Sequence, residues 1–182
     1  IQQAMKEFAE NDAVEGLLFN YKHFYGSYSF LGDSRTWYRK EVRIIKNLPG
    51  ITSYRDAQGF RMNGRKLNVK ALNASIHHYG WVRHPKYQMA KQIAAHKLWH
   101  NDDYINNKFD PEQDFDYSEI DSIRPFEGKH PLVIQPRIKQ MNWEFTRDPK
   151  VKKFGLKKWL LYKIEQLTGW RPGEYRNYRV VR

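Results

Sequence analysis

Two adjacent histidines, His77 and His78, raise the question of which one is ordinary and which one holds a ligand. They lie near the end of an alternating run, LNVKALNASIHHYG. An imidazole binds divalent metals and changes its charge near neutral pH. Neighbouring side chains of an extended chain point to opposite faces, so His78 shares a face with Ile76. His77 then shares the other face with Tyr79, and we expect only one of the two histidines to face a given site.

The segment GDSRTWYRKEVR, residues 32–43, is rich in groups that contact ligands. Its cations supply donors for phosphate or carboxylate oxygens, with arginine acting as a bidentate fork; they are Arg35, Arg39, Lys40 and Arg43. Trp37 and Tyr38 offer flat faces for a sugar ring or a base. The alternative is a sheet edge protected by charge, and the spacing does not separate the two interpretations.

Asp56 lies in the segment SYRDAQGFR, between Arg55 and Arg61. A lone carboxylate among cations stays ionised. An ionised aspartate suits a general base or a metal ligand, and it equally suits a structural salt bridge.

Two other groups have metal-like spacing. Asp114-Phe115-Asp116 matches the carboxylate spacing of a metal–diphosphate site, but it lies in an acidic run without the glycine of a calcium loop, and we expect a solvated linker. His96 and His100 are one helical turn apart. The glutamate of the zinc protease motif is missing between them, so we expect an exposed or half-buried helix face.

Periodicity and turn residues predict the elements that position these groups. Asn63-Gly64 is a strong hairpin signal. We expect helices over residues 1–10, 86–100 and 150–170, strands over 14–26, 41–47, 51–60 and 67–80, a loop over 27–40 and an acidic, loop-like linker over 101–121. The order of helix, mixed sheet, helix, acidic linker and basic tail predicts an α/β fold.

Composition narrows the function classes. The 182 residues suffice for one domain or a core with an extension, and the formal charge of +12 indicates an acidic partner. The absence of cysteine excludes disulfides, thiolate zinc sites and cysteine nucleophiles. An RNA-binding module is one candidate, because basic and aromatic residues alternate in YKHFYGSYSF and WYRK. The chain lacks the RNP1 and KH signatures of common RNA-binding modules.

Several motifs in order resemble a bacterial subgroup of the family 2 glycosyltransferases, whose fold is called GT-A. They are HFYGSYSFLGDSRTWYRKEVRIIKN, SYRDAQGFR, IHHYGWVRHP, GKHPLVIQPRI and LTGWRPGEYRNY, and they cover almost the whole chain. The resemblance implies transfer of a sugar from a nucleotide-sugar donor to an acceptor hydroxyl, with inversion. It further implies that the nucleotide-binding half and its metal-binding carboxylate motif precede Ile1, so that this chain alone is expected to be inactive.

The resemblance assigns roles to individual residues. Asp56 takes the position of the base that accepts the proton of the attacking hydroxyl, and His78 that of a histidine in the shell of a Mn²⁺ or Mg²⁺ ion. Arg35, Trp37 and Arg43 are expected to line the acceptor or diphosphate pocket. Residues 1–100 would then be the acceptor-side part of a GT-A-like mixed sheet with flanking helices, and 101–182 a linker with a basic helical extension.

The helix expected at 150–170 is basic and amphipathic, with Trp159 and Leu160 among its apolar residues. Such a helix is typical of a surface-lying membrane anchor. The alternative is that its apolar side packs on the domain's own core. With the resemblance, the first interpretation predicts a cytoplasmic protein, peripheral at the inner face of the membrane, that builds envelope polysaccharide or another glycoconjugate on a saccharide or lipid-linked acceptor.

Overall fold

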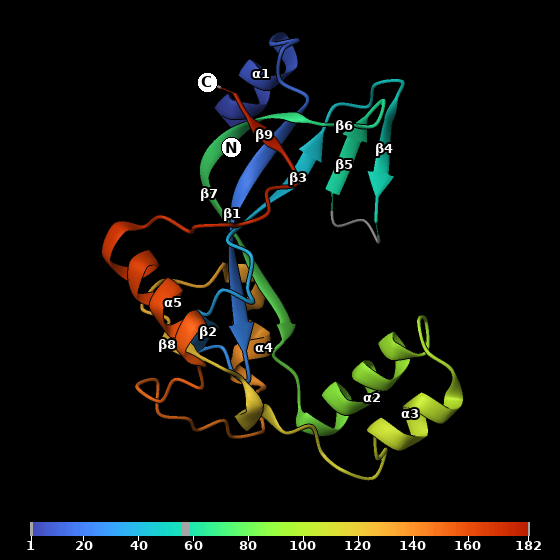
Figure 1. The fold of residues 1–182 in the computed structure, drawn as a ribbon, viewed down its shortest axis with the longest axis vertical. Coiled ribbons are helices and arrows are strands. Elements are labelled where there is room, and N and C mark those ends of the chain that lie inside the picture. The colour runs from blue at the N-terminus through green and yellow to red at the C-terminus, as the bar shows by residue number, and fades with distance from the viewer. Residues whose placement is uncertain (1, 56–58, 182) are drawn as a thin grey trace. The chain divides into compact units, whose positions relative to one another are not determined.

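The computed structural model describes residues 2–55 and 59–181, which form a mixed α/β fold (Figure 1). This described part contains five α-helices, and its main sheet combines parallel and antiparallel pairing. The expected α/β class is therefore confirmed. No helix in the described ranges combines the length and the apolarity needed to cross a membrane.

The chain divides into two compact units, each built from separate segments. The first unit comprises residues 1–22, 38–76 and 157–182, and the second comprises 23–37 and 77–156. Two long strands, β1 (Gly16–Tyr25) and β7 (Asn68–Trp81), contribute residues to both units. The expected boundary between residues 100 and 101 stays a prediction.

The first unit joins the N-terminal helix to sheet strands and the C-terminal helix. Its further elements are α1 (Gln2–Glu10), β3 (Lys40–Ile45), β4 (Ile51–Tyr54), β5 (Gly59–Met62), β6 (Arg65–Lys66), α5 (Leu156–Thr168) and β9 (Arg179–Val180). In the main sheet, β3 pairs antiparallel with β1, and β9 pairs parallel with the start of β7. Strands β4, β5 and β6 form a separate antiparallel sheet, and Leu18, Val42, Leu67 and Val69 form a buried core.

The second unit packs mainly through aromatic rings. Its further elements are β2 (Phe30–Gly32), α2 (Pro85–His96), α3 (Asp102–Lys108), β8 (Ile123–Pro125) and α4 (Gln135–Lys139). The end of β1 pairs with β2 and β2 with β8, both antiparallel. Two buried clusters are centred on Phe24 and on Tyr25, which are neighbours in β1 and therefore point to opposite faces of the sheet.

Most of the expected elements are present. The hairpin at Asn63-Gly64 is confirmed, since both residues have positive φ, 48° and 83°, as the two central residues of a type I′ turn require. The loop expected over 27–40 was partly wrong, because Phe30–Gly32 forms β2. The acidic stretch is also less loop-like than expected.

Helix α3 forms within that acidic stretch because its ends are capped. The Asn101 side chain accepts a hydrogen bond from the backbone N–H of Tyr104 at 3.1 Å. Asp102 and Asp103 lie in the first turn and Lys108 in the last, which complements the helix dipole. Acidic residues that suggested a linker thus act partly as a helix start.

Candidate functional site

The two adjacent histidines lie on opposite faces of β7. The ring of His77 stacks on Phe24, with centroids 5.6 Å apart, whereas the ring of His78 lies edge-on to His23 at 5.3 Å. Because His23 and Phe24 are neighbours in β1, their side chains point to opposite faces. The expectation that His77 and His78 have different surroundings is confirmed.

His77 belongs to an aromatic cluster. Besides Phe24, the His77 ring packs against Phe126 and Tyr79, with centroid distances of 5.7 Å and 6.4 Å. The hydroxyl of Tyr79 bonds to the His130 ring at 2.8 Å, and burial raises the pKa of Tyr79 to about 12. This face is therefore a packed ring cluster whose phenol stays neutral at physiological pH.

His78 belongs to a second cluster on the other face, centred on the buried His23. The Trp37 ring is 5.0 Å from the His23 ring. Two glycines make room for the rings of this cluster. A Cβ at Gly32 would lie 2.3 Å from the Trp37 indole nitrogen, and a Cβ at Gly80 would lie 2.5 Å from the His78 ring. A larger residue at either position would force the Trp37 or His78 ring to shift, so the two glycines leave the space that these rings occupy.

The structure therefore brings together two of the five residues expected in the site. Trp37 and His78 both adjoin His23, and Arg35 is half-buried in the connection between β2 and β3. Arg43 belongs to the first unit, where it forms an ion pair with Glu41 at 2.6 Å and donates a hydrogen bond to the Tyr21 hydroxyl at 2.5 Å.

Asp56 lies outside the described residues, between the end of β4 and the start of β5. The expectation that it shares a cavity with His78 stays a prediction.

The acidic stretch has structural contacts in the second unit. Asp116 accepts hydrogen bonds from the backbone N–H and the hydroxyl of Ser118, which lower the pKa of Asp116 and start a 3₁₀ turn. Phe115 packs against Tyr117 at 4.9 Å and Trp81 at 5.9 Å. Among residues 2–55 and 59–181, no group of three or more potential metal ligands occurs.

His96 and His100 are part of a ring stack. Their rings are nearly parallel, at 5.4 Å, and the His100 ring stacks on Tyr104 at 3.9 Å. Burial, Lys108 and His100 together lower the pKa of His96, which favours its neutral form. The helix expected over residues 86–100 ends at His96, so the expected helix face was wrong for His100, which follows α2 and is exposed.

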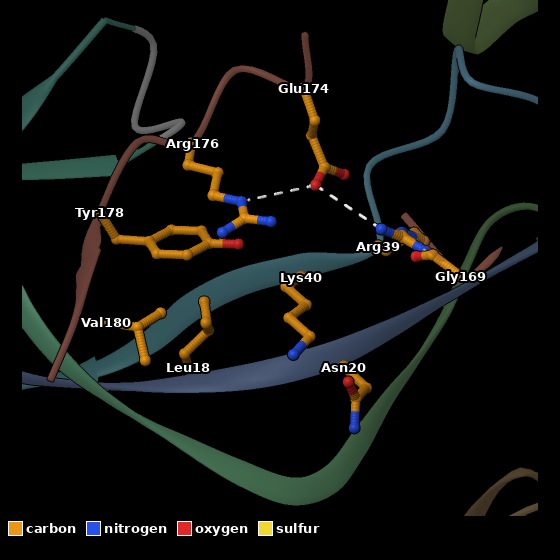
Figure 2. Close-up of a pocket in the computed structure, with 9 residues that line it drawn as sticks. All are labelled: Leu18, Asn20, Arg39, Lys40, Gly169, Glu174, Arg176, Tyr178 and Val180. Carbon is orange, nitrogen blue, oxygen red and sulfur yellow. Dashed lines mark hydrogen bonds and ion pairs between the residues drawn. The ribbon is translucent and has the colours of Figure 1, made fainter. Parts of the chain in front are cut away.

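A cavity in the first unit gathers further charged side chains (Figure 2). It encloses about 390 Å³. Three cations, Arg39, Lys40 and Arg176, line it together with one carboxylate, Glu174, and the ring of Tyr178. Burial, and next Glu174, raise the pKa of Tyr178, so its phenol is neutral at pH 7.

A buried ion pair supports one wall of this cavity. Arg171 donates to Glu165 at 2.8 Å, and both side chains are buried. Arg39 lies 3.4 Å from Glu165 and donates a hydrogen bond to the carbonyl of Gly169 at 3.2 Å. The end of α5 is thereby tied to the residue that precedes β3.

A second cavity, of about 530 Å³, shares Tyr178 with the first. It is lined by Arg65, Lys66, Asn68 and Arg179 as well. Glu15 neutralises Arg65 through contacts of 2.8 and 2.5 Å, and this pairing lowers the pKa of Glu15. Lys66 and Arg179 extend the cationic surface beyond Tyr178.

The sequence singled out Arg39 and Lys40 but missed their partners. Glu174, Arg176 and Tyr178 come from the C-terminal segment WRPGEYRNYR, where alternating basic and aromatic residues were the available signal. His23 was missed as well, although the alternation in YKHFY predicts that its side chain points to the face opposite that of Phe24.

Comparisons with protein-family models, curated proteins and solved structures found no match for this chain.

Proposed function

We propose that this chain is the acceptor-side part of an inverting, metal-assisted glycosyltransferase of the bacterial family 2 type, with a GT-A-like fold. The observation that carries the proposal is the meeting of Trp37 and His78 around His23. The resemblance assigns both residues to one site, although they lie 41 positions apart in the chain. The mixed sheet, in which β7 carries His78 and β2 and β3 flank the connection that carries Trp37, is compatible with the proposed fold.

In the proposed reaction, the Asp56 carboxylate accepts the proton of an acceptor hydroxyl. The oxygen of that hydroxyl forms a bond to the anomeric carbon of the donor sugar from the opposite side. The bond from that carbon to the diphosphate breaks, and its electron pair leaves with the nucleoside diphosphate. Attack from the opposite side gives inversion.

The proposed metal is Mn²⁺ or Mg²⁺, which would stabilise charge on the departing diphosphate. His78 fits as one imidazole ligand beside the polar ring of His23, and an imidazole among oxygens suits Mn²⁺ better. The described residues do not offer a complete ligand set, so His78 would be one ligand among others from outside them.

Ligand protection tests this proposal. Uridine or guanosine diphosphate with Mn²⁺ should raise the melting temperature of the full-length protein, and either alone should raise it less, since a ligand stabilises the state that binds it. His78→Gln should reduce the Mn²⁺-dependent part of the shift. His96→Gln, a matched change in the ring stack of α2, should leave it unchanged.

An RNA-binding module predicts the opposite pattern. Single-stranded RNA would then bind with strong salt dependence, and the nucleoside diphosphate with Mn²⁺ would give no protection. That result would contradict the transferase.

We further propose that α5 lies on an anionic membrane surface. Its exposed side chains include Leu156, Trp159, Leu160 and Leu167, at 90, 49, 56 and 85% exposure. The buried side of the helix carries Glu165, held by Arg171. Leu161 and Ile164 are half-buried, so part of the apolar surface of α5 packs inward, and another part, including Trp159 and Leu160, stays exposed and available to a membrane.

Charge selects the partner of this surface. Lys157, Lys158 and Lys163 are exposed around the apolar groups, and the Lys163 ammonium lies 5.5 Å from the centre of the Trp159 ring. Apolar side chains framed by lysines match an anionic bilayer, to which each lysine adds about 1 kcal/mol.

Vesicle sedimentation tests this contact. The protein should sediment with phosphatidylglycerol vesicles at low salt and be released at high salt. Leu160→Glu should abolish sedimentation, whereas Lys6→Glu on the exposed side of α1 should reduce it only slightly. Failure of the unmodified protein to sediment would contradict the proposal.

A further inference from the structure

The cavity of the first unit carries more positive than negative charge. Its three cations and one carboxylate leave a net charge of +2 on the lining. We propose that this cavity binds a phosphate monoester or diphosphate group of a ligand. The site goes beyond the proposed transferase and is independent of it.

Lys40 and Asn20 provide donors that the protein itself does not use. They are direct partners in the register between β1 and β3, so their side chains share one face of the sheet. Within the described ranges, neither side chain makes a hydrogen bond, and Lys40 forms no ion pair. Figure 2 shows the Lys40 ammonium on the Asn20 side of the cavity. An anion there would meet an ammonium and an amide.

Glu174 binds the two arginines of the cavity only loosely. It lies 3.7 Å from Arg39 and 3.7 Å from Arg176 (Figure 2). Charge-assisted hydrogen bonds are shorter, at about 2.7–2.9 Å. A guanidinium has five N–H donors, so one long ion pair leaves most of the donors of Arg176 available, and more than half of its side chain is exposed.

The buried pair beside the cavity behaves differently. Arg171 and Glu165 are 2.8 Å apart and buried, and Arg171 also donates to Glu174 at 3.4 Å, so this buried arginine is paired within the protein and holds the wall in place. The excess charge therefore belongs to Arg39, Lys40 and Arg176, on a wall that is already fixed. Such pre-organisation lowers the entropy cost of binding.

Size and shape favour a small phosphorylated ligand. A volume of about 390 Å³ lies in the range of small-molecule sites, roughly 300–1,000 Å³. Leu18, Tyr178 and Val180 contribute apolar surface to the same lining. A phosphate monoester carries close to two negative charges at pH 7, which matches the net charge of the lining.

Calorimetry with inorganic pyrophosphate tests the site. The titration contains EDTA and no sugar donor, so it does not report on metal-dependent donor binding. We expect saturable binding with one site per chain. Lys40→Gln should weaken it about tenfold, on the scale of one charge-assisted hydrogen bond. Arg176→Gln should also weaken it.

Glu174→Gln gives the sharper prediction, because it should strengthen binding. The amide keeps the size of the side chain but removes the charge that competes with the phosphate for Arg39 and Arg176. Lys6→Gln is the matched control, since it removes the same charge as Lys40→Gln from an exposed position outside the cavity. It should leave the affinity unchanged.

A second experiment distinguishes a lipid phosphate from the phosphate of a soluble ligand. Vesicles of phosphatidylcholine with phosphatidic acid are compared with soluble pyrophosphate. If the protein binds the vesicles, and this binding depends on Lys40 and is displaced by pyrophosphate, the ligand is a lipid phosphate. If the protein binds pyrophosphate but not the vesicles, the ligand is soluble.

Three results would overturn the site: no saturable pyrophosphate binding, equal weakening by Lys40→Gln and Lys6→Gln, or no gain with Glu174→Gln. None of them bears on the transferase proposal, whose base is Asp56. Asp56→Asn should bind pyrophosphate normally.

Discussion

In the second unit, His78 and Trp37 are positioned by rings that pack against His23 and over glycines. In the first unit, Arg39 and Arg176 are positioned by ion pairs with carboxylates. Ring packing leaves little room for substitution, because protein interiors are close-packed. Long ion pairs at a partly exposed cavity can be exchanged for a ligand at little cost. A packed site suits fixed geometry, and a charged cavity suits reversible anion binding.

Removing the buried cation of the first unit is expected to have the largest effect on stability. Arg171→Met should lower the free energy of unfolding by about 3 kcal/mol, since it removes the cation 2.8 Å from the Glu165 carboxylate and leaves that carboxylate buried. Urea denaturation measures the change. The double variant Arg171→Met/Glu165→Leu should recover most of the loss. A double variant as unstable as the single one would mean that packing, and not charge, dominates this wall.

The ring packing of the second unit is tested at Gly26. Its φ is +69°, and a Cβ there would lie 2.6 Å from the Phe145 ring. Gly26→Ala should therefore cost about 2–3 kcal/mol through backbone strain and overpacking. Gly155→Ala is the control, because its Cβ would meet nothing within 4 Å. Equal thermal stability of the two variants would show that this packing is looser than described.

Acid should weaken the first unit partly through Glu15. Its folded-state pKa is lowered, chiefly by hydrogen bonds from Arg65, so its stabilisation is present above the unfolded pKa of about 4.3 and is lost as the pH falls below it. Glu15→Gln should cost on the order of 1 kcal/mol at pH 7. The difference between the variant and the unmodified protein should shrink at pH 3. A difference that stays constant with pH would contradict this role of Arg65.

Local patterns predicted the features that depend on few residues. The strict alternation of a strand separated His77 from His78, and the φ preference of Asn63-Gly64 located the hairpin. The return of residues 169–180 to line a cavity with Arg39 and Lys40 was not predictable in this way. It depends on the parallel pairing of β9 with β7 across more than 100 residues, which no local pattern encodes.

The acidic stretch shows a second limit. Its composition alone suggested a wet linker, but the cap from Asn101 and the burial of Ile105 stabilise α3. Phe115 packs against an aromatic cluster, and the Asp116 carboxylate accepts hydrogen bonds from Ser118, whereas Asp114 is exposed as expected. Charge counts do not reveal the apolar residues between the charges that fix a segment.

The rate of sugar transfer by the full-length protein tests the proposed transferase most directly. Asp56→Asn should lower turnover by about 10² or more, the scale of general base catalysis, and leave the affinity for the nucleotide-sugar unchanged. Asp12→Asn, at a fully exposed carboxylate, is the matched control and should keep normal turnover. Near-normal turnover of Asp56→Asn, or a product with retained anomeric configuration, would contradict the account.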